Sequence, residues 1–223
     1  MNNLAEWGLK IGGSLDREVV LNHLLEAVEK IHGKTARMVI VPGGGGFADH
    51  VRARCGVRNV PGHVSHVQAA LGMAQYGIEI AAKLECGALV HDEKETREVW
   101  RAGGIPVFIP YPFILTCAGI PKSWSATSDT VAVEICRALS ISRLVLLKSV
   151  DGIMKTDGAA AAEVSAGSPP DTDVVDPLFM KHLTGGMEAY IINGRKPERL
   201  AAFFARGELE GTRIAVDKTA APS

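Results

Sequence analysis

The sequence predicts an α/β fold in which helices cover both faces of a mostly parallel, open central sheet, an αβα sandwich. Short β-type runs alternate with stretches of helical period, as in successive βα units. The run Met38-Val39-Ile40-Val41 is apolar throughout, as expected of a strand buried on both faces. The 223 residues fit one α/β core, so we expect a single domain over residues 1–223.

The predicted strands are short apolar runs, most of them ending at glycine, proline or a charged residue. They cover residues 9–11, 38–41, 88–90, 106–109, 144–147, 189–192 and 213–216. The predicted helices have apolar residues at helical spacing, or a helix-like composition after a glycine run. They cover residues 21–31, 47–51, 64–84, 95–101 and the second half of 122–139.

Two segments are expected to be loops. Residues 155–173 are rich in Ala, Gly, Ser, Pro and Asp, which is typical of an exposed loop. The segment Pro110-Tyr111-Pro112-Phe113 follows a predicted strand and is also interpreted as a loop. Residues 218–223 are expected to fray, as chain ends commonly do.

Composition excludes several classes of partner. Twenty-four Lys and Arg balance 25 Asp and Glu to a net charge of -1, so we expect no nucleic-acid or membrane partner. The four cysteines lie far apart, without the spacing of a zinc site or redox motif. No segment resembles a leader or reaches membrane-spanning length. These features predict a cytoplasmic protein.

Two glycine runs follow predicted strands, where the strand ends of a parallel sheet face one crevice. Lys10 precedes Gly12-Gly13-Ser14, and Gly43-Gly44-Gly45-Gly46 precedes a helical segment. Backbone amides of such runs bind phosphate, and a lysine within an apolar strand is costly unless it meets an anion. Neither run has the P-loop spacing. Glycine runs after strands are also often simple turns, and Lys10 alone is compatible with a solvated edge charge.

The stretch KSWSATSDTVAVEICRAL, from Lys122 to Leu139, begins with several hydroxyls and Asp129 before it becomes apolar. Asp129 is most simply a helix cap. Because Ser125, Thr127 and Ser128 can each serve as that cap, Asp129 is redundant in this interpretation. A functional role for Asp129 is the alternative.

The chain resembles the amino acid kinase superfamily, which includes acetylglutamate, uridylate and isopentenyl phosphate kinases. The resemblance spans nearly the whole chain. The motifs that carry it are KIGGSL at 10–15, VPGGGGFAD at 41–49, TSDTVAVEICRAL at 127–139, SVDGI at 149–153, INGRKPERL at 192–200 and GTRI at 211–214. The combination of SWSATSD, NGRKPERL and the pair Ser65-His66 resembles kinases of methanofuran biosynthesis, which convert aminomethylfuranyl-methyl phosphate to its diphosphate.

This resemblance implies that residues up to about 120 bind the phosphoryl acceptor and that residues from about 121 to 217 bind ATP with Mg²⁺. It also implies a dimer or larger ring and a small phosphorylated substrate. Lys10 matches a charge-neutralising lysine, and Asp129 matches a carboxylate that holds catalytic lysines. The remaining implied residues are Gly12, Gly13, Ser14, Lys148, Ser149, Asp151 and Gly152 for ATP, with Asp176 as a further nucleotide-side residue, and Gly43, Gly44, Gly45, Gly46, His66 and Ser128 for the acceptor.

A second catalytic lysine of the superfamily has no clean counterpart, because the Gly185-Gly186-Met187 region continues with Glu188. Lys148 and Lys181 are the candidates, although Lys148 also suits a solvated strand end. His66 is alternatively a polar first-turn residue behind a Ser65 cap, and His50 a silent surface histidine. Asp49 has the alternative role of complementing the start of its helix. No protein side chain is assigned to a metal.

Two other functions stay open. The same fold serves storage proteins that bind ATP and oxyanions without catalysis, and other family kinases act on uridylate, isopentenyl phosphate or acetylglutamate. A phosphate acceptor is largely ionised at neutral pH, since its second pKa is near ~6, and it needs no general base. Such a transfer depends on positioning and charge neutralisation, which the glycine runs and Lys10 suit.

Overall fold

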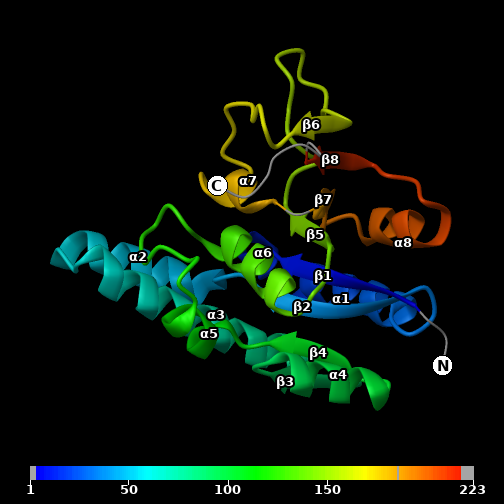
Figure 1. Cartoon of the computed structure of the whole chain (residues 1–223), viewed down its shortest axis with the longest axis horizontal. Coiled ribbons are helices and arrows are strands. Elements are labelled where there is room, and N and C mark those ends of the chain that lie inside the picture. The colour runs from blue at the N-terminus through cyan, green and yellow to red at the C-terminus, as the bar shows by residue number, and fades with distance from the viewer. Residues whose placement is uncertain (1–3, 185, 217–223) are drawn as a thin grey trace.

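A single mixed sheet organises the part of the chain that the computed structural model describes, residues 4–184 and 186–216. Within these residues eight strands lie in the order β3-β4-β2-β1-β5-β7-β8-β6, and every pair is parallel except β7 with β8. Helices cover both faces of this sheet, with α6 across its near side in Figure 1. The predicted αβα sandwich is confirmed.

The N-terminal part of the chain builds the edge that runs outward from β1 through β2 and β4 to β3. Its elements are β1 (Ala5–Ile11), the 3-10 turn η1 (Gly13–Leu15), α1 (Glu18–Ile31), β2 (Ala36–Pro42), α2 (Gly45–Arg58), α3 (Gly62–Lys83), β3 (Gly87–Val90), α4 (Glu93–Arg101), β4 (Ile105–Phe108) and α5 (Pro110–Thr116).

The C-terminal part builds the other edge, from β5 through β7 and β8 to β6. Its elements are α6 (Ser128–Ala138), β5 (Arg143–Lys148), β6 (Glu163–Ser165), α7 (Phe179–His182), β7 (Glu188–Asn193), α8 (Pro197–Arg206) and β8 (Gly211–Ala215). Because β1 lies between β2 and β5, the chain builds outward in opposite directions from β1. Ligands of open α/β sheets bind at such a switch point.

Successive strand residues face opposite sides of the sheet, which divides the apolar core into two clusters. Leu9 and Ile11 of β1 pack with α1, α8 and part of α3, whereas the other cluster contains most of α6 with α5 and α7. Lys10 lies between Leu9 and Ile11, so its side chain leaves β1 toward the α6 side. Strand alternation thereby brings the Lys10 ammonium to the start of α6.

One of the two predicted loops is wrong, and the other is confirmed except for one short strand. Residues 110–113 belong to α5, which begins with Pro110 at its first position, where the missing N–H of proline costs nothing. Residues 155–173 include β6, which pairs in parallel with β8 at the sheet edge. Two helices, α7 and α8, were not predicted, although Pro197 at the start of α8 and left-handed Gly207 at its end are recognisable signals. Residues 218–223 and Gly185 lie outside the described residues.

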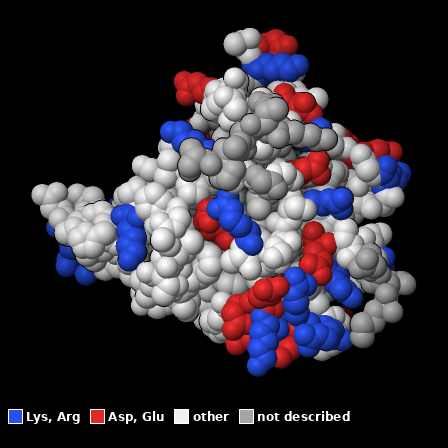
Figure 2. Space-filling model, in the orientation of Figure 1, with Lys and Arg blue, Asp and Glu red and all other residues white. Residues whose placement is uncertain are grey.

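Charged side chains of both signs are interspersed on the face in Figure 2, with the densest group at the lower right. No stripe of a single sign crosses this face. None of the described helices is both long and apolar enough to span a bilayer.

Candidate active site

Two lysines contact one buried carboxylate at the C-terminal ends of the central strands β1 and β5. Nζ of Lys10 lies 2.8 Å from Oδ1 of Asp129, and Nζ of Lys148 lies 2.6 Å from Oδ2. Lys10 comes from β1, Lys148 ends the neighbouring strand β5, and Asp129 lies in the first turn of α6. Of the two lysines, Lys148 is the more accessible, with 13% of its side chain exposed against 4% for Lys10.

This arrangement fixes the charge of its members. Burial alone would raise the pKa of Asp129, but attraction to Lys10 and Lys148 outweighs it and lowers the pKa to about 2. Burial and repulsion from Lys10 lower the pKa of Lys148 to about 8, against the attraction of Asp129 and Asp176. Asp129 is therefore ionised at neutral pH, and Lys148 loses its proton only slightly above neutral pH.

Of the two candidates for a second lysine, Lys148 is the one that lies beside Lys10 at Asp129. Lys181, the other candidate, lies exposed on α7 and lines neither of the two cavities described next. Strand order decides between them, because β5 pairs directly with β1 and brings Lys148 beside Lys10. No local sequence pattern carries that information.

Two cavities meet at the lysine pair. Cavity A, of about 300 Å³, lies between the start of α6 and helices α2 and α3. It is lined by Lys10, Gly12, Gly13, Ser14, Gly44, Gly45, Ala48, Asp49, Arg52, His66, Ala69, Ala70, Met73, Ile114, Trp124, Ala126, Thr127, Ser128, Val131 and Lys148. Cavity B, of about 490 Å³, is lined by Lys10, Thr127, Ser128, Asp129, Lys148 and residues 172–177. Lys10 and Lys148 therefore face both spaces.

The two glycine runs pack against each other beside cavity A. A Cβ on Gly13 would lie 2.4 Å from the amide nitrogen of Gly45, and one on Gly43 would lie 2.6 Å from that of Gly13. The amide of Gly43 donates to the carbonyl of Ile11, and the amide of Gly46 donates to Oδ2 of Asp16. Close packing is thus one reason for these glycines, while Gly44 and Gly45 also line the cavity.

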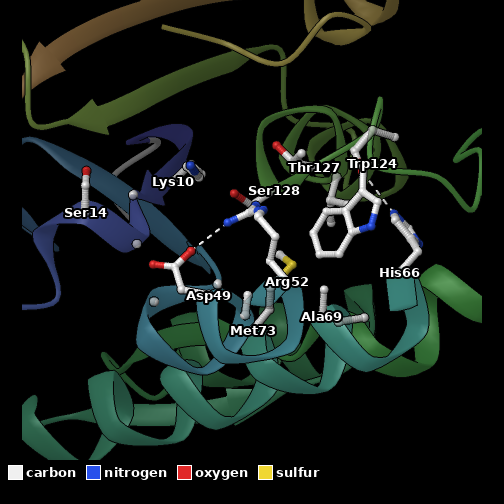
Figure 3. A pocket seen from close by; sticks show the side chains of 18 of the residues that line it. Lys10, Ser14, Asp49, Arg52, His66, Ala69, Met73, Trp124, Thr127 and Ser128 are labelled. Atoms are coloured by element: carbon white, nitrogen blue, oxygen red, sulfur yellow. Dashed lines mark hydrogen bonds and ion pairs between the residues drawn. The ribbon is translucent and has the colours of Figure 1, made fainter. Parts of the chain in front are cut away.

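His66 lies at the far end of cavity A from Lys10 (Figure 3). Its Nε2 is 3.0 Å from the carbonyl oxygen of Ala126 and carries the proton, because that oxygen only accepts. Burial lowers the pKa of His66, so the ring is neutral with its N–H already used. Ser65 does not cap the helix, since α3 begins at Gly62 and the Ser65 hydroxyl donates to the Gly62 carbonyl.

Three residues that were not among the predicted phosphate or catalytic groups form the wall of cavity A between Lys10 and His66 (Figure 3). Arg52 donates to Asp49 at 2.6 Å, and its guanidinium carbon lies 4.8 Å from the centre of the Trp124 ring. The indole N–H of Trp124 donates to the Ser65 hydroxyl at 3.1 Å. Asp49 and Arg52 face the cavity because they follow Gly45 by one and two helical turns.

The start of α6 is capped from a distance, which corrects the prediction of a local cap. Thr127 precedes the helix but its side chain makes no capping bond. Oδ2 of Asp176 instead accepts hydrogen bonds from the amides of Thr127 and Thr130. The cap interpretation of Asp129 is wrong, because both of its oxygens lie beside lysines.

Ser149, Asp151 and Gly152 line neither cavity A nor cavity B. Asp151 accepts hydrogen bonds from the side chains of Asn193, Lys196 and Arg199, which joins the SVDGI and NGRKPERL motifs. A Cβ on Gly152 would lie 2.5 Å from the Thr212 hydroxyl oxygen, and Gly152 has a positive φ of 144°. These motifs hold the β5, β7 and β8 ends together.

Comparison with known proteins identifies the family. The model of the amino acid kinase family matches residues 9–193. The chain belongs to the amino acid kinase family. Membership makes it a kinase, and the family implies the use of ATP.

A curated relative of this kinase is the 5-(aminomethyl)furan-3-yl-methyl phosphate kinase of Methanocaldococcus jannaschii, which is 28% identical over 198 residues, 86% of this chain and 89% of the relative. Solved structures share the fold. Uridylate kinase from Archaeoglobus fulgidus has a TM-score of 0.74 at 16% identity, over 95% of this chain and 100% of the other. UMP kinase from Ureaplasma parvum has a TM-score of 0.76 at 14% identity, over 95% and 99%.

The family implies a divalent metal that accompanies ATP, and the described residues offer few free ligands of their own for it. Among the described residues, no three His, Cys, Asp or Glu side chains come together in a metal-binding group. The carboxylates of Asp129 and Asp176 already accept bonds from lysines and from helix amides. Mg²⁺ is often held largely by substrate phosphates and water, which needs few protein ligands.

Proposed function

We propose that this kinase transfers the terminal phosphoryl group of ATP onto the phosphate of an aminomethylfuranyl-methyl phosphate, forming the diphosphate. The observation that carries the proposal is the meeting of cavities A and B at Lys10 and Lys148. The acceptor lies in cavity A, beside the glycine runs, and ATP with its Mg²⁺ lies in cavity B. The M. jannaschii relative, whose name specifies this substrate, supports the choice of acceptor.

In this mechanism the protein supplies charge and position. Lys10 and Lys148 neutralise the repulsion between two phosphates brought into line, and Asp129 holds both ammonium groups in place. Amides of Gly13, Ser14, Gly44 and Gly45 orient the phosphates. Mg²⁺ supplies further charge neutralisation on the nucleotide phosphates. No general base is required, because the acceptor phosphate is already ionised.

Cavity A contains one carboxylate that can bind the amine of this acceptor. Among the described residues that line the cavity, Asp49 is the acidic one, whereas Lys10, Arg52 and Lys148 are basic. Oδ1 of Asp49 accepts from Arg52, which leaves Oδ2 to accept from an ammonium group of the ligand. We therefore assign the amine to Asp49. Tyr111 and Trp124 are less suited to bind the amine through their aromatic rings, because Tyr111 does not line the cavity and the Arg52 guanidinium already lies over the Trp124 ring.

A coupled assay of ADP release tests the function. Specificity constants are compared for the furan phosphate, uridylate, isopentenyl phosphate and acetylglutamate, with ATP and magnesium. We expect the furan phosphate to be the best acceptor. An equal or higher value for any other acceptor would refute the assignment of substrate. Absence of ADP release with all four would instead favour a binding protein of this fold.

The setting of the enzyme is also a proposal. All four cysteines are free, as suits a reducing compartment, and we place the enzyme in the cytoplasm. A dimer or larger ring stays a prediction, checked by light scattering after size-exclusion chromatography.

A further inference from the structure

We propose that Asp176 is a positioning residue that holds Asp129 and its two lysines in register from the wall of cavity B. This inference rests on the proposed function, because it assigns Asp176 to the same site. Asp176 follows the segment 172–175 that lines cavity B, and it lies 47 residues from Asp129 in sequence.

The carboxylate of Asp176 is a hydrogen-bond hub. Oδ2 accepts from the amide and hydroxyl of Thr127 and from the amide of Thr130, at 2.9, 2.9 and 3.0 Å. Oδ1 accepts from the Thr130 hydroxyl at 2.6 Å and from the amides of Leu178 and Phe179 at 3.2 and 2.9 Å. Asp176 therefore ties the start of α6 to the start of α7.

Asp176 also contacts Asp129 directly. The backbone amide of Asp176 lies 3.3 Å from Oδ2 of Asp129, the oxygen that also accepts from Lys148. Thr127 immediately precedes α6 and Thr130 follows Asp129 in its first turn, so bonds to both threonines fix the turn that carries the Asp129 side chain. A shift of this turn would move both lysine contacts at once.

The charge of Asp176 also acts on Lys148. Asp176 is 7% exposed, and its negative charge stabilises the protonated form of Lys148. The charged groups that act on Lys148 are Lys10, Asp129 and Asp176. Losing the charge of Asp176 should lower the pKa of Lys148 and move the alkaline fall in activity to lower pH.

The experiment compares four variants of the full-length enzyme. Asp176→Asn keeps the size of the side chain but places an amide donor against other donors, and it removes the charge. Asp171→Asn makes the same chemical change at an exposed residue nearby that lines neither cavity. Thr130→Val removes one bond to Asp176 without altering charge, and Thr130→Ser restores the hydroxyl.

Two measurements are made on each variant. The first is kcat and KM for the furan phosphate, per mole of folded protein. The second is the titration of Lys148, followed by NMR of ¹³C-labelled lysine side chains, with Lys148→Arg to assign the signal. The titration does not depend on turnover, so it tests the inference even if the proposed acceptor is wrong.

For Asp176→Asn we expect kcat to fall roughly tenfold to a hundredfold, as small misplacements of reacting groups do, with KM changed much less. The Lys148 titration should move to lower pH. Thr130→Val should lower kcat and move the titration less than Asp176→Asn does, because it removes one hydrogen bond and no charge. Thr130→Ser and Asp171→Asn should behave as wild type.

An unmoved Lys148 titration in folded Asp176→Asn would overturn the inference, and so would a wild-type kcat. If Asp176→Asn does not fold, Thr130→Val decides, because wild-type kcat in that variant would equally refute a positioning role. A wild-type enzyme that ignores the furan phosphate refutes the proposed substrate and leaves the titration result standing.

Discussion

Side chains alternate between the two faces of the sheet along β1, and this alternation directs Lys10 toward the start of α6. There its ammonium group contacts Asp129. A lysine with 4% of its side chain exposed is stable only beside a partner, and Asp129 is that partner at 2.8 Å. The same contact leaves the ammonium facing both cavities. At this residue, stability and the proposed chemistry depend on one interaction.

Lys10→Ala should abolish turnover while ATP binding largely survives, because Lys10 acts on charge that develops during transfer. Removing such a group costs about 2.7–4 kcal/mol of transition-state stabilisation, a hundredfold or more in rate. ADP release and calorimetric ATP titration measure the two effects. Lys181→Ala, which removes an exposed lysine outside both cavities, is the control. An alanine variant of Lys10 that kept more than half of wild-type turnover would show that Lys10 is only structural.

At the scale of elements, the site depends on two strand ends that approach each other without side chains between them. Gly13 follows β1 and Gly45 follows β2, and the paired strands carry these loops into contact. The glycines of the two motifs are required by backbone packing as well as by any phosphate. This explains why two separate glycine runs occur in the sequence.

Gly13→Ala should lower the free energy of unfolding by about 1–3 kcal/mol, the usual cost of forcing an extra methyl into a packed site. It should also lower turnover, because the loop beside Lys10 must shift. Gly56→Ala is the matched control: Gly56 lies within α2, and nothing lies within 4 Å of a Cβ there. It should stabilise the helix by up to ~1 kcal/mol. Equal stability of the two variants in urea would contradict the packing argument.

At the scale of the molecule, the sheet separates two apolar clusters, and the lysine pair lies on the side of α6. Because this charged cluster is buried, the protonation of its groups changes the free energy of unfolding. Asp129 has a pKa of about 2 when folded, against 3.8 ordinarily. Its contribution to stability is therefore present above pH 4 and is lost as pH falls toward 2.

Asp129→Asn should be inactive and less stable than wild type at neutral pH, because it leaves two buried lysines without a counter-charge. The difference in unfolding free energy between the two proteins should shrink by about 2 kcal/mol between pH 5 and pH 2, following the shift in pKa. Denaturant titrations across that range measure it. A difference that did not change with pH would mean that the two lysines do not lower the pKa of Asp129.

The resemblance to a kinase family indicated a role for Asp129. The sequence by itself determined the class of fold and most strands and helices, and it indicated Lys10 and the glycine runs as candidate site residues. These follow from local rules: strand and helix periodicity, the cost of a charge within an apolar strand, and the amide-rich turns that glycine permits. The local signals also include Pro197 and Gly207, which bound the missed helix α8.

The tertiary structure decided the partners. Lys148 lies beside Lys10 because β5 pairs with β1, and Asp176 caps α6 across 46 residues from Thr130. Asp49, Arg52 and Trp124 form one wall because α2 and the segment before α6 meet there. A side chain's own neighbours in sequence specify its backbone conformation, but the order of strands specifies which charges share a site. That order depends on how the whole chain buries its apolar faces, and no local pattern encodes it.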